Sequence, residues 1–297
     1  MLDNFQIGEI HLTEANVKKL KNFGIDPKVS NTESVIKVYK TIPNGVTILL
    51  KMLYDTRNIE SKIDTIKKIR QNEELLAMDE IVLPTDVVIS KGESVGFAIP
   101  EIKNSTNLGL ILRDPKVSIK YKMDLLYKVS KLLSKTLSLN DNFYFNDLHE
   151  FNFLVDENDN IKVIDIDSSS INSNKATPSY YLVTDPKLTE VPKYKFNEVG
   201  LPYSGRDCDI YCYNIMLMNT LANYQIQKLT FLELSEYLDY LLSIGIDEAI
   251  IDSIINLYTT KPNELITTNL NDINCNLYQA RYSTYKQLKD MEVKKTR

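Results

Sequence analysis

Cysteine and long apolar runs are both scarce in this chain of 297 residues. No stretch approaches the roughly 18 apolar residues that a membrane-spanning helix needs. The N-terminus lacks the basic start and apolar run of a signal peptide. The three cysteines, Cys208, Cys212 and Cys275, are too few for a disulfide framework and indicate a reducing compartment. We therefore expect a cytoplasmic protein with no membrane partner, in which Cys208 and Cys212 are core residues rather than zinc ligands.

An excess of basic residues is also missing. The chain has 35 Lys and Arg against 40 Asp and Glu, which gives a formal net charge of −5. A nucleic-acid-binding protein usually carries a basic field, so we expect no nucleic-acid partner. The length is enough for one two-lobed domain or for two small domains with substantial cores.

The first third of the chain shows strand-like patterns around one helix. Two runs rich in β-branched residues, 35–40 and 46–53, are separated by Pro43-Asn44-Gly45, which predicts a hairpin turn. An apolar stripe at helical spacing follows them, and then two further strand-like runs. The predicted elements are a helix over 13–23, strands over 35–40 and 46–53, a helix over 59–78, and strands over 81–89 and 95–102.

Beyond a polar segment at 103–107 the pattern becomes mostly helical. The predicted elements here are a helix over 119–139, a strand pair over 151–155 and 161–166, and helices over 207–222, 230–244, 247–258 and 276–291. Strands with one helix, followed by helices that enclose one hairpin, predict an α+β fold. We expect a small β-rich lobe over 1–102 and a larger helical lobe over 103–297.

The segment 146–168, NDLHEFNFLVDENDNIKVIDIDS, gathers oxygen-bearing side chains around a predicted hairpin. Asp147 and Asn152 flank a tight loop, and Asp165 ends the second strand. Magnesium prefers such carboxylate and amide oxygens, and a carboxylate free of metal can position a nucleophile and accept its proton. The alternative is a surface hairpin after a polar loop, since Asp and Asn are common turn residues.

Asp147 is followed five residues later by Asn152 and, thirteen residues after that, by Asp165. This spacing resembles the catalytic loop and magnesium loop of the protein-kinase superfamily. The resemblance implies a two-lobed protein-kinase-like fold that uses ATP and Mg²⁺. It implies Asp147 as the catalytic aspartate, and Asn152 and Asp165 as metal ligands. Asp167 departs from the family, which has glycine there, and this second carboxylate could bind the other metal or change how the loop flips.

Lys51 is the second element of the resemblance. Alternation along 46–53 places it among buried strand residues, where a lysine needs a partner. The resemblance implies that Lys51 holds the α- and β-phosphates and pairs with a helical glutamate. The alternative is a strand-end lysine with its ammonium in water. Glu73, on the face of Ile66 and Ile69, is the expected partner, and Glu60 is a rival near the helix start.

Two further positions match the family by their place in the chain. The run 97–102, FAIPEI, resembles the strand that leads into the adenine-binding hinge. That resemblance makes Ile99 the gatekeeper and places Glu101 and Ile102 in the nucleotide-binding hinge. Asp209 resembles the aspartate that anchors the catalytic loop, with a plain helix N-cap as the alternative.

The chain also departs from the family. No glycine occurs in 30–34, where a glycine-rich phosphate loop is expected, and Phe145-Asn146 replaces the usual His-Arg pair. His149 stands where many protein kinases carry lysine, and it could meet the γ-phosphate. These features are typical of atypical bacterial or phage eukaryotic-like kinases and of antibiotic-kinase-like members. The expected partners are MgATP and a protein hydroxyl, with a small-molecule acceptor or a pseudokinase scaffold as alternatives.

Overall fold

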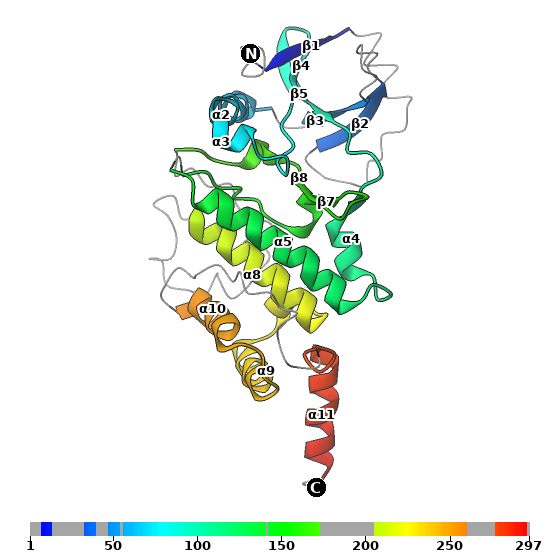
Figure 1. Cartoon of the computed structure of the whole chain (residues 1–297), viewed down its shortest axis with the longest axis vertical. Helices are drawn as coiled ribbons and strands as arrows, with labels where there is room; N and C mark the ends of the chain where they lie inside the picture. Colours follow the sequence, from blue (N-terminus) through cyan, green and yellow to red (C-terminus); the bar gives the residue numbers. More distant parts are fainter. Residues whose placement is uncertain are drawn as a thin grey trace. The chain divides into compact units, whose positions relative to one another are not determined.

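The computed structural model describes residues 7–13, 33–39, 47–53, 56–140, 142–172, 205–259 and 277–295. The chain divides into two compact units: Met1–Ser105 with Lys162–Ile171, and Thr106–Ile161 with Asn172–Arg297. The larger β-sheet belongs to the first unit and most helices belong to the second, so the fold class is α+β (Figure 1). The segment Lys162–Ile171, which we expected in the second lobe, belongs to the first unit. Backbone bonds from Val163 to Glu80 and from Val82 to Val163 hold it there.

The first unit contains a five-stranded sheet in the order β1-β4-β5-β3-β2. Its strands are β1 (Gly8–Leu12), β2 (Glu33–Tyr39), β3 (Thr47–Leu53), β4 (Asp86–Ser90) and β5 (Glu93–Pro100). β1 pairs with β4 in parallel, and every other pair is antiparallel. Ile48, Leu50, Val88 and Ala98 pack together as a buried cluster. Successive side chains of a strand point to opposite faces, so Lys51 lies on the face opposite Leu50.

The face that carries Lys51 packs against a helix. Lys51 is directly opposite Phe97 on β5, and Phe97 is opposite Val87 on β4. Phe97 and Val87 form a buried cluster with three isoleucines of α2 (Ile59–Gln71), which are Ile59, Ile63 and Ile66. Gly96 permits the close approach of β5 to β3, because a Cβ there would lie 2.0 Å from the Lys51 carbonyl oxygen.

The helix predicted over 59–78 is wrong in its second half. α2 ends at Gln71, and a short helix, α3 (Glu73–Leu76), begins after it. Asn72 takes an extended conformation, and its side chain accepts a hydrogen bond from Leu75 N at 2.8 Å. A capping asparagine competes with continued helix, which explains the break.

Two predicted elements of the first unit lie outside the described residues: the helix over 13–23, apart from Thr13, and the turn at 43–45. β1 was not predicted. The strand predicted over 81–89 begins only at Asp86. Residues before it, including Pro84, do not belong to the sheet.

The second unit is built around α8 (Arg206–Ala222), which lies beside α5 (Ile119–Leu137) (Figure 1). α8 is buried at nearly every described position, including Cys208 and Cys212, which confirms that these two cysteines are core residues. The other helices described in this unit are α4 (Leu108–Arg113), α9 (Phe231–Ser243), α10 (Glu248–Thr259) and α11 (Tyr282–Lys295), with short 3-10 turns η2 (Glu150–Asn152) and η5 (Ile226–Lys228). Among the described residues, no helix combines the length and apolar character needed to cross a membrane.

The described residues also include three short strands. β6 (Thr106–Asn107) pairs antiparallel with β7 (Phe153–Val155), and β8 (Ile161–Val163) follows β7 in the chain. Asp156 binds the turn between β7 and β8 by accepting from Asn158 N and Asn160 N, at 2.9 Å each. The predicted strand pair is therefore present, with β8 ending two residues before Asp165.

Candidate functional site

Asp165 and Asp167 leave the end of β8 through a sharp turn. Asp165 has a φ of 63°, in the left-handed region that aspartate tolerates better than most residues. The 3-10 turn η3 (Ile166–Ser168) follows directly and carries Asp167. This turn brings two carboxylates, two residues apart, to the same point in the first unit.

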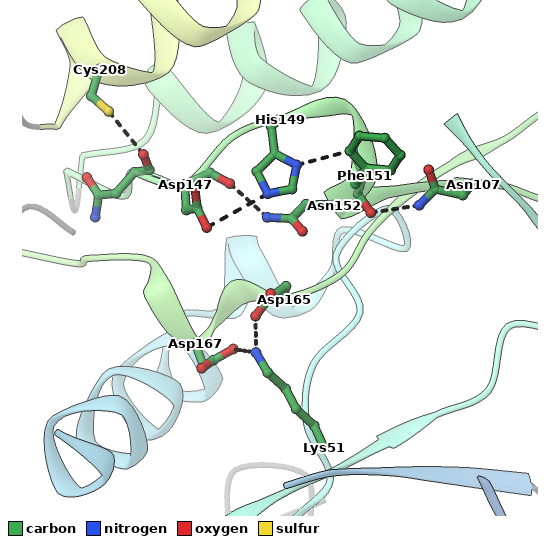
Figure 2. A network of polar contacts seen from close by, with 10 residues as sticks. Lys51, Asn107, Asp147, His149, Phe151, Asn152, Asp165, Asp167 and Cys208 are labelled. Carbon is green, nitrogen blue, oxygen red and sulfur yellow. Dashed lines mark hydrogen bonds and ion pairs between the residues drawn. The ribbon is translucent and has the colours of Figure 1, made fainter. Parts of the chain in front are cut away.

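That point is the ammonium of Lys51. Lys51 Nζ donates to the Asp165 carboxylate and to Asp167 Oδ1, the latter at 2.6 Å (Figure 2). The side chains of Lys51 and Asp167 are only 5% and 2% exposed. Phe97, Val82 and Ile99 line a cavity of about 10 Å³ beside the three charged groups. Lys51, Asp165 and Asp167 were each predicted from the sequence as site residues, and the structure brings all three together.

Lys62 of α2 is a fourth member of this cluster. Its ammonium donates to Asp167 Oδ2, while Lys51 binds the other oxygen of the same carboxylate. Burial alone raises the pKa of Asp167, but Lys51, its contact with Asp165, and Lys62 together hold that pKa well below its usual range. Asp167 is therefore a buried carboxylate whose ionised form is stabilised by the two lysines.

A divalent cation fits the chemistry of this cluster. Two carboxylates already converge on one cation, the Lys51 ammonium. In the described part of the chain no three His, Cys, Asp or Glu side chains gather at one metal position. Mg²⁺ does not require that, because it binds through one or two carboxylates and completes its shell with water and phosphate oxygens. Asp165 and Asp167 are thus the residues of the first unit that would hold it.

The loop that contains Asp147 lies in the second unit and is held from α8. Asp209 is fully buried and accepts hydrogen bonds from Phe145 N and Asn146 N, both at 2.7 Å. Cys208 Sγ donates to Asn146 O at 3.0 Å (Figure 2). The α8 N-cap is Gly205, so Asp209 anchors the loop and does not cap the helix.

The Asp209 carboxyl group lies among the buried apolar side chains of α8. Burial raises its pKa to about 7, although the two backbone N–H groups lower it, and the Asp147 charge raises it further. Desolvation thus exceeds the stabilisation that two good hydrogen bonds give to the charged form.

Inside the loop, His149 and Asn152 fix the backbone around Asp147. Asn152 Nδ2 donates to Asp147 O at 2.8 Å, so the side-chain carbonyl oxygen of Asn152 is the atom that could bind a metal. His149 Nδ1 accepts from Phe151 N at 3.2 Å and caps η2. In the neutral ring the proton is then on Nε2, which lies 3.9 Å from Asp147 Oδ2 (Figure 2).

Glu73 does not lie where the sequence placed it. The expected face of Ile66 and Ile69 requires a continuous helix, whereas Glu73 starts α3 and is exposed. Lys51 is instead bound by Asp165 and Asp167. Lys62 was missed, although a signal existed: it lies four residues before Ile66, on the same helical face.

The expected hinge residues lie at the end of β5 in the first unit. Ile99 pairs with Leu49 and lines the small cavity beside Lys51. Glu101 and Ile102 follow the strand and are half-buried. Glu101 and Ile102 therefore lie where the chain leaves the sheet. Their role in adenine binding stays a prediction.

A larger cavity, of about 680 Å³, opens in the second unit. Arg113 and Glu150, which form an ion pair at 2.8 Å, stand at its wall. Most of the other lining side chains are amides or small polar groups. The full lining is Leu112, Arg113, Glu150, Met216, Asn219, Thr220, Asn223, Tyr224, Gln225, Gln227 and Lys228.

Comparison with known proteins adds no identification: no protein-family model matches the chain, and no curated protein matches it either.

Proposed function

We propose that this chain is a protein-kinase-like phosphotransferase that moves the γ-phosphate of ATP, in the presence of Mg²⁺, to a hydroxyl group of a protein. The observation that carries the proposal is the ion cluster of the first unit. Lys51 lies more than a hundred residues from Asp165 and Asp167 in sequence, yet it binds both carboxylates. A phosphate-binding cation and two metal-binding carboxylates are what phosphoryl transfer requires at one place.

The second unit supplies the other chemistry that the proposal needs. The Asp147 carboxylate is 24% exposed on a loop whose backbone is fixed by Asp209 and Asn152. A partly exposed carboxylate on a loop held by several hydrogen bonds suits the task of orienting a hydroxyl and accepting its proton. Bound Mg²⁺ would supply charge neutralisation at the phosphates.

One observation favours a small-molecule acceptor as a second candidate. The cavity of about 680 Å³ has the size of sites that hold drug-sized ligands, about 300–1,000 Å³. It includes Glu150, three residues after Asp147. A polar small molecule with hydroxyl groups is the acceptor that this lining would suit.

The test of the proposed function is a transfer assay with γ-labelled ATP and Mg²⁺, with a generic protein acceptor in one arm and hydroxyl-bearing small molecules in another. We expect Asp147→Asn and Asp165→Asn each to lower transfer by at least about 100-fold, the scale of a lost general base or metal ligand. Asp64→Asn, on the exposed face of α2, is the matched control and should keep full activity.

Thermal denaturation with and without MgATP separates binding from transfer. A ligand that binds only the folded state stabilises it by about 2.7 kcal/mol at a hundred times its Kd. Stabilisation without transfer to any acceptor would favour the pseudokinase scaffold. Equal phosphate transfer by wild type and both site variants would refute the proposed phosphotransferase activity.

A further inference from the structure

Lys62 occupies a position on α2 where a charged residue is unexpected. It lies three residues after Ile59 and four before Ile66, both of which are buried. Residues at these spacings share one face of a helix. The Lys62 side chain is accordingly only 27% exposed. The helix therefore directs this lysine toward the sheet face that carries Lys51.

Lys51 and Lys62 bind the two oxygens of one carboxylate. Lys51 donates to Asp167 Oδ1 at 2.6 Å and Lys62 donates to Asp167 Oδ2. Two ammonium groups that hold one oxyanion through adjacent oxygens form an anion site. A phosphate group offers the same pair of adjacent oxygens and forms charge-assisted hydrogen bonds of the same kind. Asp167 therefore occupies a site that also suits a phosphate.

The charges of this cluster compensate one another, and a bound metal would change that balance. The cluster contains two ammonium groups and two carboxylates, which compensate one another. A Mg²⁺ ion bound to Asp165 and Asp167 would take both anions as ligands. With its oxygens shared with the metal, Asp167 would compensate the buried Lys51 ammonium and the partly buried Lys62 ammonium less fully, so an added anion beside them would be favourable. The phosphates of the nucleotide are the anions that arrive with the metal.

We propose that Lys62 is a second phosphate-binding residue, which together with Lys51 holds the phosphates of MgATP once Asp167 is engaged by the metal. This inference rests on the proposed function and extends it to a residue outside the motif positions. Its ligand class is a nucleoside di- or triphosphate with a divalent cation. The simpler alternative is that Lys62 only neutralises Asp167.

The test measures the affinities of ATP, ADP and adenosine with Mg²⁺, by calorimetry, for wild type, Lys62→Met and Lys62→Gln. Lys62→Gln removes the charge but keeps a polar side chain with a hydrogen-bond donor, so this variant keeps the test valid if Lys62→Met does not fold. We expect both variants to bind ATP and ADP about 10- to 100-fold more weakly, the scale of one charge-assisted hydrogen bond. Adenosine binding should be unchanged. Lys67→Met, at an exposed position of α2, is the control.

The outcomes separate this inference from the proposed function. If wild type binds MgATP and both Lys62 variants bind it equally well, the inference is wrong and the proposed function stands. Equal weakening of ATP and adenosine would also overturn it, because that pattern indicates a general disturbance of the pocket. If wild type binds no nucleotide, both proposals fail. An ATP affinity of Lys62→Arg close to that of wild type would support the role of the positive charge.

Discussion

Replacement of Asp209 tests directly whether this side chain anchors the loop that contains Asp147. Replacement by alanine removes the acceptor of two backbone N–H groups, Phe145 N and Asn146 N, at a place where Asp209 and Asn146 are fully buried. Each buried amide left without an acceptor costs about 1–3 kcal/mol. The two amides together predict a loss of roughly 2–6 kcal/mol in the free energy of unfolding of Asp209→Ala.

The size of this loss should depend on pH, in a direction fixed by the pKa. Burial raises the pKa of Asp209 to about 7, against about 3.9 in an unfolded chain. Between these values the folded state keeps a proton that the unfolded state has lost. The stability that Asp209 contributes is therefore complete below about pH 4 and declines as the pH rises toward and through 7. The alanine variant lacks this titration, so its deficit should be larger at pH 5 than at pH 8.

Guanidinium unfolding followed by far-UV circular dichroism measures both effects, and the absence of tryptophan makes dichroism the better signal. Asp239→Ala, at an exposed position of α9, serves as the control and should change stability by no more than about 0.5 kcal/mol. A deficit in Asp209→Ala no larger than that of the control at pH 5 would refute the anchoring argument. A deficit that grows from pH 5 to pH 8 would refute the assigned direction of the pKa.

Two further predictions concern the first unit. Lys51→Met should lower the free energy of unfolding by about 3 kcal/mol, because it removes one cation from a buried carboxylate, and Lys51→Met with Asp167→Asn should be more stable than Lys51→Met alone in the same denaturation assay. Gly96→Val should destabilise by about 1–3 kcal/mol in thermal denaturation, because its Cβ would collide with the Lys51 carbonyl; a melting temperature equal to that of wild type would contradict the packing of β5 on β3.

The elements with strong periodicity could be predicted from the sequence to within a few residues. The helix expected over 119–139 is α5 at Ile119–Leu137, and the one expected over 207–222 is α8 at Arg206–Ala222. Side-chain pattern decides these elements because their apolar faces are long. The break after Gln71 depends on one capping contact of Asn72, which is a local detail that apolar spacing does not encode. β1 contains a glycine and pairs at the sheet edge, so its sequence carries little strand signal.

The residues of the candidate site likewise differ in how well the local sequence predicts them. Asp147, Asn152, Asp165 and Asp167 could be chosen from the sequence because their spacings are short and a hairpin fixes them. The contact of Lys51 with Asp167 spans 116 residues, and nothing in the local pattern of either residue specifies the other. A buried lysine such as Lys51 needs a partner on chemical grounds, and it has one. Glu73 could be that partner only if the helix continued past Asn72.

Charge balance explains why a lysine rather than a glutamate faces the cluster from α2. We expected Lys51 to pair with a helical glutamate, whereas here the second aspartate, Asp167, itself binds Lys51. A glutamate on the buried face of α2 would add a third carboxylate to a site with one ammonium. Lys62 instead gives two cations for two anions, and buried charges persist only when they are paired. The Asp-Ile-Asp sequence at 165–167 therefore has a consequence for the helix: with Asp167 buried and Asp165 partly buried beside Lys51, a basic residue on α2 is favoured over an acidic one.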